Sequence, residues 1–157
     1  MNVDARVRLI GFVVVLVVLH FALRVGLGLG TLAPDLLVVA FLVYAREAKP
    51  GTAAGVGLLL GLLEGSVTYT VGASSLVLAV LGYFAARSRE VLASDGLVLM
   101  AFYLFIGKWA YDVLLFGVTT LSAHTGPVAS LVVFSLPAAI YAAAAGVAAV
   151  MAYRAVA

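Results

Sequence analysis

Six ionisable side chains lie within otherwise apolar segments of this sequence, and their types and spacing could support chemistry. Lys108 and Asp112 stand four residues apart in the stretch YLFIGKWAYDVLLFG. On a helix, this spacing puts both groups on one face, where they can form an ion pair. The whole set comprises His20, Arg24, Asp35, Glu64, Lys108 and Asp112.

Charges of both signs in apolar surroundings can serve one of two purposes. They can bind or conduct a polar species, as in proton relays and transporters. Alternatively, they can pair with one another and fix the alignment of helices at some cost in stability. The residues alone leave both purposes open. A rise of about 1.5 Å per residue places all of these groups at similar depth in a membrane, so we expect Glu64 to be the second partner of Lys108, and Arg24 to pair with Asp35.

Other kinds of chemistry find little support in the sequence. The chain has no cysteine, which excludes disulfides and thiolate metal sites. It contains no GxSxG or HExxH motif, and His20 and His124 lie in different segments. Its Lys and Arg residues do not form the basic patch of a nucleic-acid-binding protein. We therefore expect a non-enzymatic protein without a cofactor, a metal, a nucleic-acid partner or a small-molecule substrate.

The composition places the chain in a lipid bilayer. Its 157 residues are 66% hydrophobic and only 10% charged, with a mean hydropathy of +1.25. A soluble domain of this size needs a larger hydrated surface. Because a membrane span takes about 20 apolar residues, the pattern predicts one all-α integral membrane domain over residues 1–157 with six transmembrane helices. The apolar blocks are residues 9–27, 33–45, 52–67, 73–86, 96–118 and 128–153.

Basic residues indicate how these helices are oriented. Connectors without any Lys or Arg alternate with connectors that carry them, and cytoplasmic connectors are the ones enriched in Lys and Arg. The alternation puts both termini in the cytoplasm and the protein in a multi-pass orientation. Because His20 and Arg24 interrupt the first block, we interpret it as a retained span rather than a signal peptide. The basic residues in question are Arg6, Arg8, Arg46, Lys49, Arg87, Arg89 and Arg154.

Some of the spans are expected to be short or broken. Blocks two to four offer only about 13–16 apolar residues each, so neighbouring helices must cover the missing depth. The run GLGLG at residues 26–30 is interpreted either as a bend before Pro34 starts the next helix or as a plain external loop.

Small residues mark two helix faces that are expected to pack closely. Gly57, Gly61 and Gly65 recur every fourth residue in the third block. In the sixth block Ala138, Ala142 and Gly146 follow Pro137, which is expected to kink the helix. Such stripes let helix backbones approach one another within lipid.

The order of several short motifs resembles the rod shape-determining protein MreD family over roughly residues 33–146. The matching features are Pro34-Asp35-Leu36 with Tyr44, the glycine-rich helix from Gly57 to Glu64, Gly82-Tyr83 with Arg87, and Pro137 with Tyr141. The family commonly has Gln-Asp after the Gly-Leu-Leu run, whereas this chain has Glu64-Gly65. The carboxylate is thereby displaced by about 100° around the helix.

The resemblance implies a non-enzymatic scaffold of the bacterial inner membrane that determines cell shape. Such proteins bind MreC and link the MreB cytoskeleton to RodA and the elongation transpeptidase, which build peptidoglycan. The family fold is similar to that of the S components of energy-coupling-factor transporters. The alternative function is therefore a vitamin-binding subunit for uptake, which would need a closed pocket near the outer face.

Overall fold

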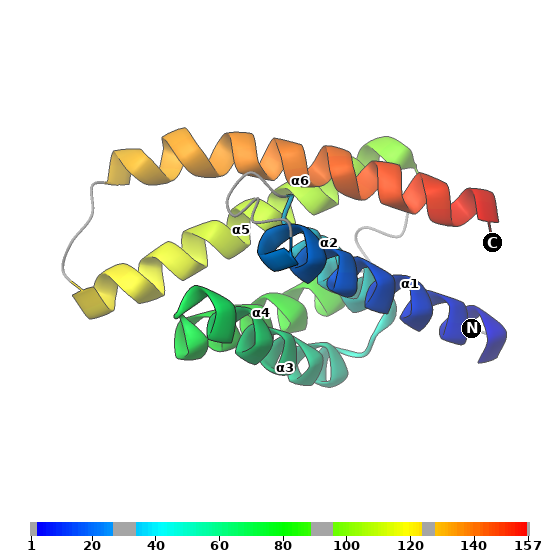
Figure 1. Cartoon of the computed structure of the whole chain (residues 1–157), viewed down its shortest axis with the longest axis horizontal. Helices are drawn as coiled ribbons and strands as arrows, with labels where there is room; N and C mark the ends of the chain where they lie inside the picture. Colours follow the sequence, from blue (N-terminus) through cyan, green and yellow to red (C-terminus); the bar gives the residue numbers. More distant parts are fainter. Residues whose placement is uncertain (1–2, 27–33, 89–95, 124–127, 157) are drawn as a thin grey trace.

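The computed structural model of the protein describes residues 3–26, 34–88, 96–123 and 128–156. Within these ranges all regular structure is helical, and one helix corresponds to each of the six apolar blocks (Figure 1). The elements are α1 (Val3–Phe21), the π-helical turn η1 (Ala22–Gly26), α2 (Leu36–Glu47), α3 (Pro50–Thr68), α4 (Val71–Arg87), α5 (Leu97–Ala123) and α6 (Val128–Val156).

Among the described residues, four helical segments are long and apolar enough to cross a membrane: 6–24, 50–68, 97–120 and 135–155. The chain is therefore an all-helical, multi-pass membrane protein. Two of the three blocks expected to be short form short helices: α4 has 17 residues and α2 only 12. The expectation was wrong for the third block, because α3 has 19 residues and is one of the four long segments. At about 1.5 Å per residue, α2 is roughly 18 Å long, well below the thickness of a bilayer core.

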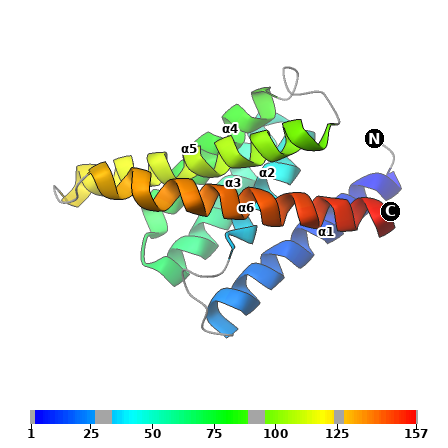
Figure 2. The ribbon, with the colours of Figure 1, turned by 90° about the horizontal axis from the view of Figure 1, so that it is seen from above.

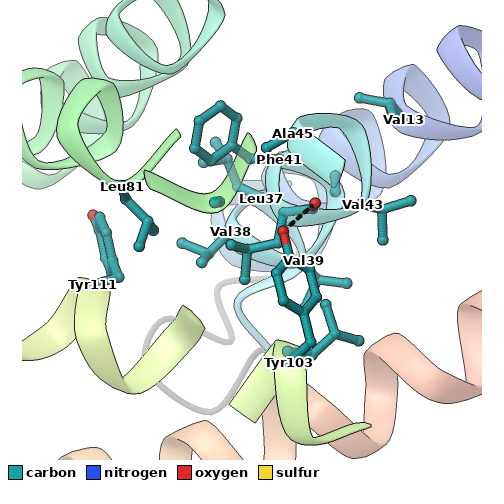
Figure 3. Packing of buried hydrophobic residues seen from close by; sticks show 14 of the residues in the cluster. Val13, Leu37, Val38, Val39, Phe41, Val43, Ala45, Leu81, Tyr103 and Tyr111 are labelled. Carbon is teal, nitrogen blue, oxygen red and sulfur yellow. Dashed lines mark hydrogen bonds between the residues drawn. The ribbon is translucent and has the colours of Figure 1, made fainter. Parts of the chain in front are cut away.

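Helix α2 lies at the centre of the molecule. Its residues 36–43 are all buried, so it has no apolar face left for lipid. Figure 3 shows its side chains pointing outward in several directions, with Phe41 toward α3 and α4 and Val39 toward α5 and α6. The Tyr103 hydroxyl of α5 donates a 2.9 Å hydrogen bond to the carbonyl oxygen of Leu42. The core of this protein is thus built around a helix that the other helices enclose.

The predicted glycine stripe on α3 forms a close contact with α4. Gly57, Gly61 and Gly65 are all buried. A Cβ added at Gly57 would lie 2.4 Å from the carbonyl oxygen of Leu78, and one at Gly61 would lie 2.4 Å from the Cα of Ser75. Both neighbours are backbone atoms, so the two helices can be this close only because the side chains are absent.

A further close-packed glycine, Gly82 on α4, was noted in the sequence only as part of the family resemblance and not as a packing position. A Cβ at Gly82 would meet the ring of Phe41 at 2.4 Å and the carbonyl oxygen of Ala53 at 2.8 Å. The α3–α4 hairpin turns at Tyr69, which has a left-handed backbone with φ of 59° and caps α3. Gly82 therefore completes the packing of this hairpin against α2.

Helices α5 and α6 lie side by side in Figures 1 and 2. Ala142 and Gly146 face inward as predicted, and a Cβ at Gly146 would lie 2.7 Å from the Leu104 side chain. Ala138 is exposed, so its inclusion in the stripe was wrong; Ala139, one residue on, is the buried position. The α-helix continues through Pro137, which is also exposed.

The start of α1 and the end of α6 lie at the same end of the molecule in both views (Figures 1 and 2). The rings of Phe12 and Tyr153 are in contact there, with centroids 4.7 Å apart.

The boundary between α1 and α2 differs from the expected one. Helix α2 begins at Leu36 rather than Pro34, with Asp35 as its N-cap. The run at residues 26–30, which was expected to bend or form a loop, lies outside the described residues apart from Gly26, the last residue of η1.

Candidate functional site

The structure brings all six predicted charged residues into one cluster. They come from five elements, of which α1 and η1 are contiguous and the others lie further along the chain. The cluster can therefore hold the first helical segment, α2, α3 and α5 together. His20 is on α1, Arg24 on η1, Asp35 at the N-cap of α2, Glu64 on α3, and Lys108 and Asp112 on α5.

Lys108 is the centre of one half of the cluster. Its Nζ atom lies 2.5 Å from Oδ1 of Asp112 and 2.9 Å from Oδ2 of Asp35. The predicted i,i+4 pair is therefore present. The prediction that Glu64 would be the second partner was wrong, because the N-cap of α2 brings Asp35 to this place instead.

Glu64 is the centre of the other half. Its Oε1 atom accepts a 2.6 Å hydrogen bond from Arg24, and its Oε2 atom lies 3.1 Å from Nε2 of His20. The predicted pairing of Arg24 with Asp35 was wrong, because the Glu64 carboxylate on α3 faces the first helical segment and pairs with Arg24.

His20 connects the two halves. While its Nε2 atom contacts Glu64, its Nδ1 atom lies 3.9 Å from Oδ1 of Asp35. Its ring is buried, and the neighbouring ring of Phe21 meets it edge-on at 5.2 Å. Since α1 packs mainly on α2, this histidine and Arg24 provide a direct link from the first segment to α3.

Asp35 has two roles that its position in the sequence could have suggested. Its Oδ1 atom accepts a 3.4 Å hydrogen bond from the backbone N–H of Val38, which caps α2. Its other oxygen binds Lys108. An aspartate immediately before an apolar run is a usual helix start signal, and this would have placed the carboxylate at the helix end.

Tyr111 is a member of the site that the sequence analysis missed. The Lys108 ammonium lies 5.0 Å from the centre of its ring, within the range of a cation–π contact. Its side chain is buried. Because an aromatic residue three positions from a lysine is common in any apolar helix, no sequence signal marked it.

The charged groups of the cluster are paired with one another. Glu64 and Lys108 are buried, Asp35 and Asp112 are partly buried, and each makes at least one contact to a group of opposite or variable charge. Among the described residues no group of three or more His, Asp or Glu side chains is placed to hold a metal ion. The arrangement is suited to fixing helices in place.

A cavity of about 310 Å³ lies apart from this cluster, between α4 and α5. Leu42 and Gly107 are among its lining residues, as are Phe84, Phe102 and Ile106, which are exposed. The two hydroxyls in its wall already donate to backbone carbonyl oxygens, Tyr103 to Leu42 and Ser88 to Ala85, so the cavity surface is mostly apolar.

A comparison of the chain with protein-family models, curated proteins and solved structures finds no match.

Proposed function

We propose that the protein is a non-enzymatic scaffold of the bacterial cell-elongation machinery in the inner membrane, similar to the MreD family. In this role it binds MreC and connects the MreB cytoskeleton to RodA and the elongation transpeptidase. The observation that carries the proposal is that the six interior charges contact one another across five elements. Charges used in this way hold helices in register, which a scaffold requires.

Two further features support a scaffold over a vitamin-binding subunit. The wall of the cavity between α4 and α5 is almost entirely apolar, and the hydroxyls of Ser88 and Tyr103 within it already donate to backbone carbonyl oxygens, whereas small-molecule sites usually present a few polar groups to the ligand. In addition, α1 leaves Val14, Val15 and Val18 largely exposed on its outer face. Within a bilayer, such a face can contact lipid or the single helix of a partner.

Affinity purification from native membranes tests the proposed function. We expect MreC and RodA to co-purify with the tagged protein, and loss of the protein to convert rod-shaped cells into round ones. A tag on an unrelated multi-pass protein of the same membrane serves as the control. Recovery of a bound vitamin together with a coupling ATPase, and normal cell shape after loss of the protein, would instead identify an uptake subunit.

Orientation in the membrane provides a second test. Reporters fused after Arg89 or at Ala157 should read cytoplasmic, and reporters near Gly28, Gly72 or Ala123 should read periplasmic. The reason is the alternation of basic and uncharged connectors. The shared end of α1 and α6 also supports termini on one side. Termini on opposite sides of the membrane would contradict the six-span arrangement.

A further inference from the structure

The six groups of the cluster contact one another in a linear order. The contacts run from Asp112 to Lys108, Asp35, His20, Glu64 and Arg24, with N–O distances of 2.5, 2.9, 3.9, 3.1 and 2.6 Å. The signs alternate along this chain, except that the charge of His20 depends on its protonation. His20 therefore occupies the one position where two carboxylates would otherwise adjoin.

The charge balance of the chain is incomplete without His20. The three carboxylates of Asp35, Glu64 and Asp112 face the two fixed cations Arg24 and Lys108, which leaves one negative charge. An uncompensated charge is costly in a buried, membrane-embedded site. A second proton on His20 brings the sum to zero without any further group.

The orientation of the His20 ring also indicates a second proton. Nε2 faces Glu64 and Nδ1 faces Asp35, so a carboxylate oxygen lies beyond each nitrogen. A neutral imidazole has one nitrogen with a lone pair and one with a proton. Its lone pair would point at a carboxylate, whereas an imidazolium presents a proton to both. The distance of 3.9 Å from Nδ1 to Asp35 is an ion-pair distance rather than a hydrogen bond, and Nδ1 has no hydrogen-bond partner among the described residues. His20 is only 1% exposed.

We propose that the cluster is a proton-binding site in which His20 carries a proton on both ring nitrogens at neutral pH, and that this proton fastens α1 to α3 and to the start of α2. Without it, Asp35 and Glu64 repel each other across a neutral ring, and α1 loses its charged attachment. Arg24 and Lys108 contact the outer sides of these carboxylates, and Asp112 contacts Lys108. This inference is independent of the partners named above.

Nitrogen NMR of the purified protein tests the protonation directly. The chain has two histidines, so His124→Gln leaves His20 as the only imidazole. At neutral pH we expect its two ring nitrogens to have similar shifts, both typical of protonated nitrogen. One protonated and one unprotonated nitrogen at neutral pH would overturn the proposal.

Two substitutions test the proposed attachment. His20→Gln should lower the Tm of the purified protein by about 5 °C, because it leaves a buried charge unbalanced. Asp35→Asn alone should lower it similarly by leaving an excess positive charge, although asparagine also caps helices well. Together they leave two neutral pairs, Lys108 with Asp112 and Arg24 with Glu64, so the double variant should regain most of the loss.

A neutral His20 would give different results for the same variants. If His20 is neutral, its ring has one donor and one acceptor nitrogen, and the amide of glutamine in His20→Gln also offers a donor and an acceptor. Asp35→Asn would then remove the excess negative charge of the cluster. His20→Gln would then change Tm little, and Asp35→Asn would have the same effect in both backgrounds. That outcome would refute the proposal. His124→Gln is the control for replacing a histidine, and its Tm should equal that of the parent.

Discussion

Replacing Lys108 with methionine should lower the amount of folded protein in the membrane strongly. The substitution leaves Asp35 and Asp112 without their shared cation. Removing one partner of a buried ion pair costs about 3–5 kcal/mol in soluble proteins. Lys49→Met makes the same change at an exposed helix end, where the side chain makes no capping hydrogen bond, and should leave the protein level unchanged. Membrane abundance and restoration of cell shape are the measurements.

Second-site changes distinguish the observed pairing from the one expected from sequence. Lys108→Met with Asp112→Asn removes a neutral pair and leaves Asp35, His20, Glu64 and Arg24 in contact, so abundance and cell shape should recover together. Lys108→Met with Glu64→Gln should not recover, because it also leaves Arg24 without its carboxylate. Rescue by Glu64→Gln instead would contradict the contacts described here. Full abundance without function in every charge variant would indicate a relay or transport role.

Replacing Gly61 with alanine should separate α3 from α4. The added methyl group would lie 2.4 Å from the Cα of Ser75, a backbone atom that cannot rotate away. Overpacking of this kind costs about 1–3 kcal/mol. Thermal unfolding of the purified protein measures the loss.

Gly55→Ala is the matched control, because it adds the same methyl group to the same helix. Among the described residues, an added Cβ there would meet nothing within 4 Å outside its own turn of helix. Alanine favours helix over glycine by about 1 kcal/mol. The control should therefore be unchanged or slightly more stable. Equal effects of the two substitutions would show that close approach at Gly61 does not determine the packing.

The helices could be predicted because each leaves a continuous apolar run in the sequence. The faces of α3 were predictable too, since Gly57, Gly61 and Gly65 recur at the helical period. The packing role of Gly82 could not be predicted, because a single glycine does not form a periodic pattern. Its role also depends on Phe41, which lies on another helix.

The membership of the charged cluster followed from depth, but its internal pairing did not. Counting residues gives the height of a group along a helix and says nothing about which neighbour its face meets. Glu64 pairs with Arg24 because α3 turns that face toward the first segment, where η1 carries the arginine. Asp35 contacts Lys108 from the N-cap of α2. The expected helix start at Pro34 had placed Asp35 inside the helix instead of at its end.

The enclosure of α2 has a consequence for biosynthesis. This helix is synthesised before its neighbours α5 and α6. With 12 residues, it is too short to insert stably by itself. The nascent chain must therefore keep α2 in a provisional location until the C-terminal half arrives. Completion of the fold becomes a late event of translation, and chains truncated before α5 should be substrates for membrane proteases.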